Sequence, residues 1–408
     1  MLFRKSLAKL FIYCLNVIAL LFGTTTIVIA QVAYKFSISV DFTGPYADVM
    51  PSWHAGQRAM IDYWNDTKGK ELGVKVEYKV YDTRYDAAVI ASTWPGILSR
   101  DKPILHLGMG GPDLVSLGKR LSRDQVPMIV PTAMIGLMWL PDNWYFTVRP
   151  TYSHEFSALL SELQRRLPEK RALRITTVST QGKPAYEDQV NGVIQLTKMY
   201  PERFSMASFV WIEDNPVSAT DRIRNALLSN PDVLIVGATT QQAVATLRSL
   251  KELGKQIPVI TSSQNGLPVL RTMLSPEYIE GTYSVFSFAP STEPTKAQIV
   301  FDKYHTGPGT WDLSASQAAA QTMLGLRILQ RAIHMVGKDK VTGDTMYQAF
   351  LSGPISSEEM LDLTPDIQFD KTRPFPIGQI RAKAIVFKNG KIMPFGDGWL
   401  PSPELKKW

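Results

Sequence analysis

Two kinds of hydrophobic pattern alternate along most of the chain. Short segments in which apolar and polar residues alternate, or in which apolar residues form a brief run, predict strands. Longer segments with apolar residues every three or four positions predict helices. In residues 36–40, three apolar side chains alternate with two serines. Residues 52–65 place Ala55, Ala59 and Tyr63 on one helical face. These patterns recur in a regular order that indicates one fold class.

Strands and helices are predicted in strict alternation up to residue 261. The predicted strands are residues 36–40, 74–80, 103–107, 126–130, 173–178, 204–211, 232–236 and 258–261. The helices between them are residues 52–65, 86–98, 112–121, 153–166, 185–199, 218–228 and 241–253. Strands separated by helices of about 10–16 residues are typical of parallel sheets covered by helices on both faces. We therefore expect an α/β protein with two doubly wound parallel-sheet lobes in series, joined by a hinge near residues 149–153.

The last third of the chain departs from this alternation. Helices are expected at residues 295–304, 313–336 and 345–351, and the second places Arg327, Arg331 and His334 on one face. A hairpin of residues 382–387 and 391–394 turns at Asn389-Gly390. We expect these pieces to complete one lobe and then return to the other. The predicted division is 31–150 plus about 286–365 for lobe 1, and 151–285 plus about 366–408 for lobe 2.

Composition agrees with a globular protein of two lobes. The chain has 408 residues, more than the ~250–300 at which a single core stops growing. Apolar residues make up 45% and charged residues 20%, which excludes a largely disordered chain. Lysine plus arginine exceed aspartate plus glutamate by 44 to 37, and three of the cations lie in the first ten residues. This small and scattered excess does not indicate a nucleic-acid partner.

The N-terminus has the order of a secretory signal peptide. Arg4, Lys5 and Lys9 precede an apolar run over residues 10–22, and small residues follow up to Ala30. We expect residues 1–30 to be a signal peptide cleaved after Ala30, and the mature protein to reach the periplasm. The alternative is an uncleaved anchor, because residues 10–30 are long enough to span a membrane. Cys14, the only cysteine, lies within this segment, so the mature chain forms no internal disulfide.

The sequence lacks the common signatures of catalytic, metal and cofactor sites. Its five histidines are far apart, and none has a second ligand at metal-binding spacing. There is no G-x-S-x-G elbow, no H-E-x-x-H and no P-loop, and the Gly108-Met109-Gly110-Gly111 run lacks the third glycine of a dinucleotide fingerprint. We therefore expect no cofactor, no metal and no enzymatic activity.

The loops at the carboxyl ends of the predicted strands are the candidate ligand site. In open parallel sheets, ligands bind at this edge, and facing loops of two lobes form a cleft. Gly110 and Gly111 precede a predicted helix, where backbone N–H groups could receive a carboxylate. The candidate ligand-binding residues, taken from these loops and the helices that follow them, are Tyr46, Trp53, Met109, Gly110, Gly111, Thr132, Ala133, Met134, Tyr186, Thr239 and Ser263.

An ordered set of short motifs resembles the type I periplasmic binding proteins, in the branch of the leucine/isoleucine/valine-binding protein. Residues 42–47, Phe-Thr-Gly-Pro-Tyr-Ala, resemble the opening of that family, and residues 80–89 resemble its next block. Further matches are residues 126–131, 143–150, 231–234, 247–254, 280–283 and 388–391. The resemblance spans essentially the whole mature chain and implies a monomeric, non-enzymatic protein. Such a protein captures a small solute in the periplasm and delivers it to the membrane permease subunits of an ABC importer.

The sequence departs from the family at the positions that hold an amino-acid ligand. The resemblance aligns the family's serine-rich carboxylate loop with Gly110-Gly111, and its alanine–alanine–threonine run with residues 132–134. It aligns the acidic partner of the ligand ammonium with Ser263, and a tyrosine with Thr239. A desolvated ammonium without a counter-charge costs several kcal/mol, so we expect a carboxylate-bearing solute without an α-amino group. An aromatic body is one candidate for this solute, because an apolar wall could be formed by Tyr46, Trp53, Met109, Met134 and Tyr186.

Two other function classes stay open on the sequence alone. The same two-lobe module could present a ligand to a membrane receptor or kinase. An exported α/β enzyme could use Asp41, Asp82 or Asp86 for acid–base work, although each lies where strand ends and helix caps commonly place an aspartate.

Overall fold

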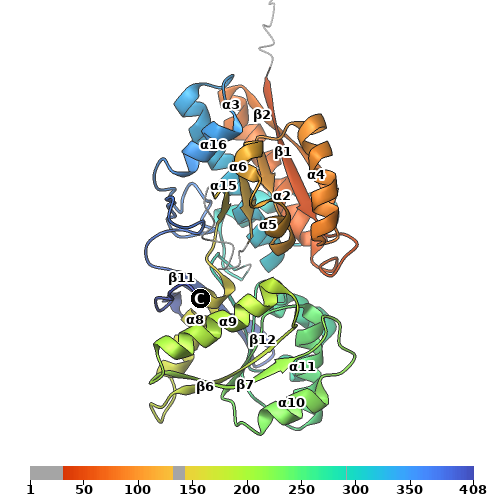
Figure 1. Ribbon diagram of the computed structural model, residues 1–408, viewed down its shortest axis with the longest axis vertical. Coiled ribbons are helices and arrows are strands. Elements are labelled where there is room, and N and C mark those ends of the chain that lie inside the picture. The colour runs from red at the N-terminus through yellow and green to blue at the C-terminus, as the bar shows by residue number, and fades with distance from the viewer. Residues whose placement is uncertain (1–30, 132–142, 291) are drawn as a thin grey trace, which may run out of the picture.

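The computed structural model describes residues 31–131, 143–290 and 292–408, and shows two lobes, one above the other (Figure 1). The signal peptide expected at residues 1–30 therefore lies outside the described residues, as do Thr132, Ala133 and Met134. Each lobe is built on its own sheet, as the alternation of strands and helices predicted. No helix of the described residues is long and apolar enough to cross a membrane.

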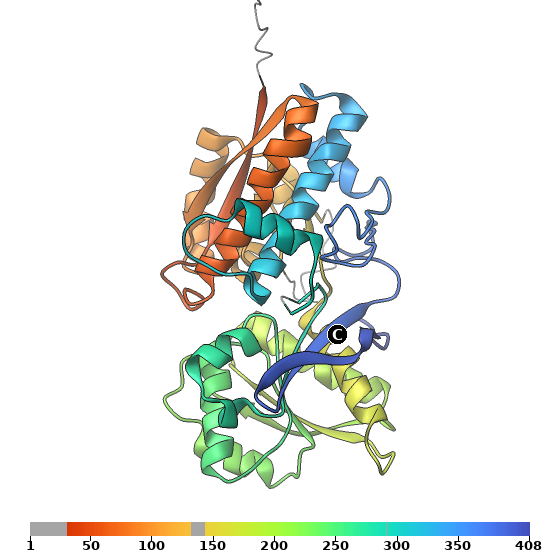
Figure 2. The ribbon, with the colours of Figure 1, turned by 180° about the vertical axis from the view of Figure 1, so that it is seen from behind.

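The upper lobe contains a five-stranded parallel sheet in the order β2-β1-β3-β4-β5. Its strands are β1 (Val32–Val40), β2 (Val74–Asp82), β3 (Leu105–Leu107), β4 (Met128–Val130) and β5 (Tyr145–Thr147). The helices near it are α2 (Met50–Trp64), α3 (Lys70–Leu72), α4 (Ala87–Asp101), α5 (Gly111–Leu117), α6 (Leu121–Asp124), α14 (Lys296–Tyr304), α15 (Leu313–Val336) and α16 (Gly343–Phe350). A π-helical turn, η1 (Asn65–Gly69), joins α2 to α3. All but the last three helices come from the first 124 residues, so the chain returns to this lobe late (Figure 2).

Alternate residues of β4 face two different cores, which explains why both faces of the sheet carry helices. Ile129 belongs to the buried cluster that includes residues of α2 and α15. Met128 and Val130 belong to a second cluster, with Trp94 of α4 and Leu117 of α5. Period-two alternation in a strand sends successive side chains to opposite faces, and here both faces are apolar.

The lower lobe contains a seven-stranded sheet in the order β12-β11-β10-β9-β8-β6-β7. The parallel strands are β6 (Leu173–Ser179), β7 (Phe204–Trp211), β8 (Val233–Val236), β9 (Val259–Thr261) and β10 (Thr282–Phe286). The antiparallel hairpin β11 (Arg381–Lys388) and β12 (Lys391–Pro401) adds the last two strands. The helices are α8 (Tyr152–Arg165), α9 (Pro184–Met199), α10 (Thr220–Leu227), α11 (Thr240–Glu252), α12 (Leu267–Met273) and α13 (Pro276–Ile279).

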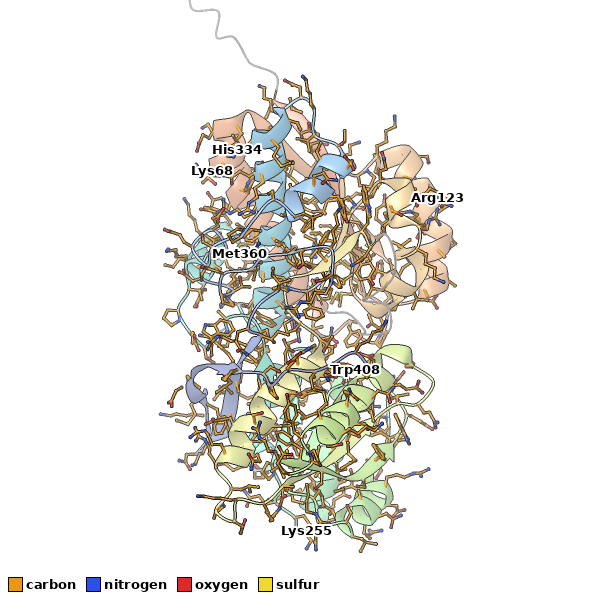
Figure 3. All side chains as sticks on the ribbon, turned by 60° about the vertical axis from the view of Figure 1, so that its left-hand side comes forward. Lys68, Arg123, Lys255, His334, Met360 and Trp408 are labelled. Atoms are coloured by element: carbon orange, nitrogen blue, oxygen red, sulfur yellow. The ribbon has the colours of Figure 1, made fainter. Side chains whose placement is uncertain are left out.

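Three chain segments connect the lobes, and hydrogen bonds tie them together. The segment from β5 to α8 is bonded to the segment before β11, because Thr147 N donates to Pro374 O over 2.8 Å. The segment after β10 is bonded to the first residue of β11, because the Ser287 hydroxyl donates to Arg381 O over 2.8 Å. The chain ends beside this junction, where Trp408 Nε1 donates to Asp188 Oδ1 over 3.0 Å (Figure 3). These tied segments form the hinge that the fold class predicts.

Several elements differ from the sequence expectation. The helix predicted over residues 112–121 is two helices, α5 and α6, separated by a turn at residues 118–120. The strands β5 and β10 and the short helices α12 and α13 were not predicted as elements. On the face of α15 with Arg327, Arg331 and His334, the two arginines are covered, because Arg327 Nε donates to Glu359 O and Arg331 Nη1 to Gly353 O, whereas His334 is exposed.

The late return to the upper lobe extends beyond residue 365. The Phe369 ring packs edge-on against Phe146 and Phe350, with centroid distances of 5.4 and 5.9 Å. Ile367 pairs with Ile355 through backbone hydrogen bonds. These contacts place residues 367–369 beside β5 and α16, and the exact division of the chain between the lobes stays a prediction.

Candidate functional site

The loop after β1 is folded around the buried carboxylate of Asp41. Its Oδ2 accepts a hydrogen bond from Tyr46 N over 2.7 Å, and its Oδ1 lies against Gly44, where a Cβ would come within 2.1 Å. Burial raises the pKa of Asp41, and the neighbouring acids Asp82 and Asp48 add to the shift. The Gly-Pro turn and this carboxylate together hold Tyr46 in a buried position at the carboxyl end of β1.

Tyr46 makes a direct contact between the lobes. Its hydroxyl lies 2.5 Å from the hydroxyl of Tyr186, which comes from the first turn of α9 in the other lobe. The Tyr46 ring also packs edge-on against Tyr85, which follows β2, with centroids 4.8 Å apart. The structure therefore brings together the predicted residues Tyr46 and Tyr186, from opposite lobes.

A fourth tyrosine completes this group. Tyr152, the first residue of α8, lies close enough to Tyr46 and Tyr85 for its hydroxyl to raise the pKa of both. We call Tyr46, Tyr85, Tyr152 and Tyr186 the tyrosine cluster. Burial raises the pKa of all four hydroxyls, and for Tyr46 and Tyr85 the hydroxyl of Tyr186 is the next largest cause. All four therefore stay neutral at physiological pH and can donate hydrogen bonds.

The glycine loop after β3 has its backbone N–H groups occupied. Asp113 Oδ2 accepts hydrogen bonds from Met109 N over 2.9 Å and from Gly110 N over 3.2 Å. The N–H of Gly111 faces the Tyr85 hydroxyl. Gly110 has φ of +151°, a conformation that favours glycine, and a Cβ there would lie 3.2 Å from Tyr85 Oη. The loop is thus held against the tyrosine cluster by the protein itself.

A fully buried polar network continues behind this loop. Asp113 Oδ1 accepts from the Ser39 hydroxyl over 2.8 Å and lies 3.3 Å from His106 Nε2, while His106 Nδ1 lies 2.8 Å from Ser37 Oγ. The residue types are those of a serine-nucleophile triad. Because Ser37, His106 and Asp113 are all buried, a substrate could not reach the hydroxyl, and we assign the network to positioning the glycine loop.

The hinge holds a buried ion pair that the sequence analysis missed. Arg149 and Glu155 are both 0% exposed, and Arg149 Nε donates to Glu155 Oε1 over 2.8 Å while Nη2 contacts Oε2. Glu155 Oε1 also accepts from Ser287 N over 2.7 Å. The guanidinium lies over the rings of Tyr152 and Phe288, at 4.7 and 5.5 Å from their centroids. The pair therefore joins two of the three connecting segments beside the tyrosine cluster.

The hinge network extends across to α15. Arg149 Nη1 donates to Ser263 Oγ over 2.7 Å, and the Ser263 hydroxyl donates to Gln317 Oε1 over 2.8 Å. Ser263 follows β9 in one lobe and Gln317 lies in α15 of the other, so this is a second link between lobes. Among the described residues, Gln317 Nε2 is buried without a hydrogen-bond partner. Tyr152 Oη makes no hydrogen bond of regular geometry, although burial raises its pKa and Ser263 lies close enough to offset part of that rise.

The other predicted site residues have structural positions. Trp53 and Met109 are buried in the same apolar cluster as Tyr46. Thr239 caps α11, because its hydroxyl accepts from Gln242 N over 3.2 Å and donates to Asp214 O over 2.5 Å. Sequence analysis did not identify Tyr85, Tyr152, Arg149 or Gln317. Tyr85 and Tyr152 could have been found from their places after a predicted strand and at the predicted split, whereas nothing in the sequence marks Gln317.

The three acids considered for catalysis have local structural partners. Asp41 is part of the turn described above. Asp82 accepts from the Thr43 hydroxyl over 2.8 Å, and Asp86 caps α4 by accepting from Ala88 N and Val89 N. No group of three or more histidine, cysteine, aspartate or glutamate side chains suited to a metal ion occurs in the described part of the chain.

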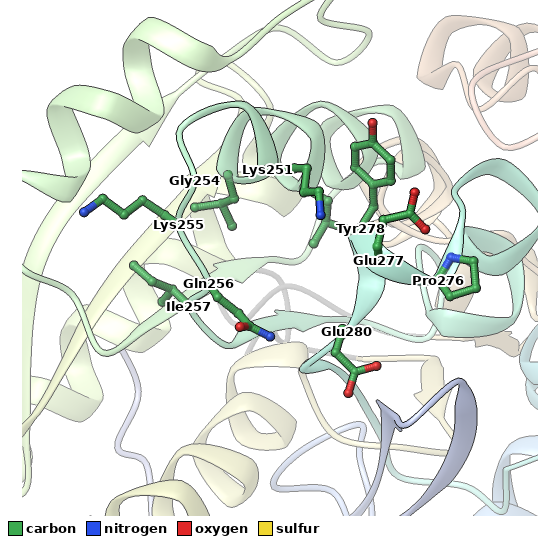
Figure 4. A pocket seen from close by; sticks show the side chains of 11 residues that line it. Lys251, Gly254, Lys255, Gln256, Ile257, Pro276, Glu277, Tyr278 and Glu280 are labelled. Atoms are coloured by element: carbon green, nitrogen blue, oxygen red, sulfur yellow. The ribbon is translucent and has the colours of Figure 1, made fainter.

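The lower lobe also has an open surface pocket of about 670 Å³ (Figure 4). Its lining includes Lys251, Lys255 and Tyr278, together with Ile257 just before β9 and Glu280 just before β10. It therefore lies at the amino ends of the strands, whereas the tyrosine cluster lies at the carboxyl ends. Figure 3 places Lys255 at the end of the lower lobe farthest from the upper one. None of the predicted site residues lines this pocket.

Comparison with protein families gives one match over most of the chain. The sequence model of a family described as periplasmic binding protein matches residues 33–381. No curated protein matches the sequence.

Solved structures of similar fold cover nearly the whole chain at low identity. A branched-chain amino acid ABC transporter protein from Thermus thermophilus with bound valine has a TM-score of 0.75 and 18% identity, and the match covers 92% of this chain and 98% of that one. A fatty acid ABC transporter substrate-binding protein from Thermomonospora curvata has a TM-score of 0.72 and 15% identity, over 91% and 93% of the two chains. LivJ from Streptococcus pneumoniae, in complex with isoleucine, has a TM-score of 0.70 and 14% identity, over 91% and 100%. At these identities the structures support the fold, and their descriptions name solutes of different chemistry, valine, isoleucine and fatty acids.

Proposed function

Because the chain belongs to the periplasmic binding protein family, we propose that it captures a small solute between its lobes and delivers it to the membrane subunits of an ABC importer. The observation that carries this proposal is the contact of Tyr46 and Tyr186, one from each lobe, at the carboxyl ends of the strands. Closure of two lobes about a hinge sequesters a ligand at such a junction.

We propose further that the solute bears a carboxylate and has no α-amino group. The resemblance places Ser263 where an acidic partner of a ligand ammonium is expected, and Ser263 accepts a hydrogen bond from Arg149. A ligand ammonium would therefore meet a serine bonded to the Arg149–Glu155 ion pair instead of a free carboxylate, and an ammonium without a counter-charge in a desolvated site is costly. The tyrosine cluster supplies aromatic walls, which favours an aromatic or branched apolar body.

Calorimetry with leucine and with benzoate-like acids tests the proposed function. We expect a benzoate-like acid to bind and to raise the melting temperature without being converted, because a ligand that binds the native state stabilises it. Replacing Tyr186 by alanine (Tyr186→Ala) should abolish binding, whereas Tyr278→Ala in the outer surface pocket should leave it unchanged. Tight binding of leucine, or conversion of the solute, would contradict the proposal.

The proposed transport role requires export of a free, monomeric protein. We propose that residues 1–30 are removed after Ala30 and that the mature chain acts in the periplasm as a monomer. N-terminal sequencing of the exported protein and light scattering of the purified chain test these points. A retained N-terminus would indicate an anchored protein instead.

A further inference from the structure

Two buried donors without partners lie at the hinge side of the tyrosine cluster. Gln317 is 0% exposed, and its Nε2 has no hydrogen-bond partner among the described residues. The hydroxyl of Tyr152, also buried, makes no hydrogen bond of regular geometry, although burial raises its pKa and Ser263 lies close enough to offset part of that rise. Native proteins leave few buried polar atoms unpaired, because each costs about 1–3 kcal/mol. Among the eighteen buried side-chain atoms of the described residues that lack a partner, these two are donors that lie beside the contact between the lobes, where a group supplied from outside the chain would bind.

Arg149 fixes the direction of the hydrogen bonds through Ser263 and Gln317. A guanidinium has donors only, so the Ser263 oxygen that receives Arg149 Nη1 must pass its own proton onward. That proton goes to Gln317 Oε1, 2.8 Å away. The Gln317 amide is thereby oriented with its carbonyl toward Ser263 and its NH₂ group away from it. The group that this chain of hydrogen bonds leaves available to a ligand is therefore a donor, the NH₂ group of Gln317.

Glu155, the acidic residue of the hinge, has no carboxylate oxygen free to accept a hydrogen bond from a ligand. Both oxygens of Glu155 contact Arg149, and Oε1 also receives Ser287 N. Arg149 has five N–H groups, of which Glu155 and Ser263 take three. The hinge side of the site therefore combines an ion pair without net charge, an amide NH₂ and a phenol, and Glu155 has no oxygen free of Arg149.

The backbone N–H groups of the glycine loop are already bonded to, or face, other groups of the protein. Asp113 already receives the N–H groups of Met109 and Gly110, and Gly111 N–H faces Tyr85. The glycine loop is therefore a poor seat for a ligand carboxylate, contrary to what its composition favours. Its contribution is to support Tyr85 within the tyrosine cluster.

We infer that Gln317 and Tyr152 bind the ligand's carboxylate at the hinge end of the inter-lobe site, with its apolar body against Tyr46, Tyr85 and Tyr186. This inference rests on the proposed function and assigns the anion to the hinge instead of the glycine loop. Carboxylate oxygens accept hydrogen bonds only, and charge-assisted bonds are about twice as strong as neutral ones. The two donors match that requirement, and Arg149 has further N–H groups beyond the three that Glu155 and Ser263 take.

Two matched sets of compounds test the inference by calorimetry with the mature protein. The first is 3-phenylpropanoate, phenylalanine and phenethylamine, and the second is 4-methylpentanoate, leucine and 3-methylbutylamine. Within each set the apolar body is constant and only the charged groups differ. We expect the acid to bind at least tenfold more tightly than the amino acid in at least one set, and the amine not to bind.

Variants then locate the carboxylate. Gln317→Glu replaces a donor by an anion and should weaken binding of the acid more than tenfold. Tyr152→Phe keeps the ring and should weaken it about ten- to 150-fold, the value of one hydrogen bond to a charged group. The matched controls are Gln348→Glu on an exposed position of α16 and Tyr145→Phe, which removes another buried hydroxyl without a described partner. Both controls should bind the acid as the wild type does.

The outcomes separate this inference from the proposed function. Acid binding that Tyr152→Phe and a folded Gln317→Glu leave unchanged would overturn the inference and leave the proposed function standing. Amino-acid binding as tight as acid binding would overturn the inference as well. Failure of every compound to bind the folded wild type would count against the proposed function, and with it this inference. Because Tyr152→Phe preserves the packing, the inference stays testable even if Gln317→Glu does not fold.

Discussion

At the residue scale, the polar atoms buried near the inter-lobe contact fall into two groups. Asp113, Glu155 and Oδ2 of Asp41 accept hydrogen bonds from the chain's own loops and side chains. Gln317 Nε2, Tyr152 Oη and Oδ1 of Asp41 have no partner among the described residues. The first group holds the site in shape, and the two donors of the second group are available to a ligand. Substitutions in the first group should therefore act mainly on stability.

Asp113→Ala tests the role of the buried network behind the glycine loop. It removes the acceptor of two backbone N–H groups and of the Ser39 hydroxyl. Hydrogen bonds to charged groups contribute about 1.5–3 kcal/mol each and are not additive, so we expect a loss of about 2–4 kcal/mol in the free energy of unfolding. Urea denaturation measures it, with the exposed Asp397→Ala as control. An unchanged midpoint in Asp113→Ala would rule out the positioning role.

His154 should make stability depend on pH. Burial lowers its pKa from 6.5 to about 3, with a smaller contribution from Arg373. The folded state keeps the ring neutral, whereas the unfolded chain binds a proton below pH 6.5. Stability therefore falls as the pH falls from about 6.5 towards about 3, by about 1.4 kcal/mol per pH unit well inside this window.

The comparison of two variants isolates this effect. Between pH 7 and pH 5, the wild type should lose about 2 kcal/mol more than His154→Gln. His334→Gln, at an exposed position, should behave as the wild type. Equal pH dependence of the wild type and His154→Gln, measured by urea denaturation, would show that His154 titrates normally in the folded state.

Sequence could predict the site residues that belong to a local motif, and only those. Tyr46 follows a Gly-Pro turn at a strand end, and Tyr186 opens a helix in the equivalent place of the second lobe. The group around Arg149 has no such mark. Ser263 and Gln317 lie 114 and 168 positions after Arg149 in the chain, and only the folded hinge brings the three together. The donor polarity that we use to place the carboxylate follows from that assembly.

At the element scale, the upper lobe depends on close packing of α2 against α15. A Cβ at Gly56 of α2 would lie 2.3 Å from the backbone oxygen of Ala315 in α15, so the absence of a side chain permits this approach. The long, strongly periodic helices and the strands with clear alternation were predicted correctly. Strands such as β5, of three residues, are too short for a periodic signal and depend on pairing with neighbours.

Gly56→Ala and Gly96→Ala form a matched pair of helix substitutions. Alanine favours a helix over glycine by about 1 kcal/mol. At Gly96 of α4 the nearest atom to a new Cβ is the flexible end of Arg100, 3.2 Å away, so we expect unchanged or slightly higher stability. At Gly56 the obstacle is backbone, and we expect a loss of about 1–3 kcal/mol. Thermal denaturation measures both, and equal effects would contradict the packing argument.

At the scale of the whole molecule, three connecting segments converge on the Arg149–Glu155 pair. The Glu155 carboxylate accepts hydrogen bonds from Arg149 Nε in one segment and from Ser287 N in another. The Ser287 hydroxyl in turn donates to Arg381 O, at the end of the third segment. The resemblance predicted two lobes and a hinge, but the sequence does not show that the hinge is held by a buried ion pair. The pair therefore lies where the three connecting segments meet.

Glu155→Gln should destabilise the protein strongly. It leaves the buried guanidinium of Arg149 without its counter-charge, and breaking one partner of a buried pair costs about 3–5 kcal/mol. Glu71→Gln removes one partner of the exposed pair with Lys68 and should change the free energy of unfolding by less than about 1 kcal/mol. Equal effects of the two substitutions in urea denaturation would show that the Arg149–Glu155 pair does not stabilise the hinge.

The central claim is that one solute is held unchanged between the lobes by the tyrosine cluster, and native mass spectrometry tests it most directly. The mature protein saturated with the acid selected by calorimetry should gain the mass of one molecule, which is recovered chemically unaltered after denaturation. The double variant Tyr46→Ala/Tyr186→Ala should show no such mass. A bound molecule retained by the folded double variant, or recovery of an altered product from the wild type, would contradict the account.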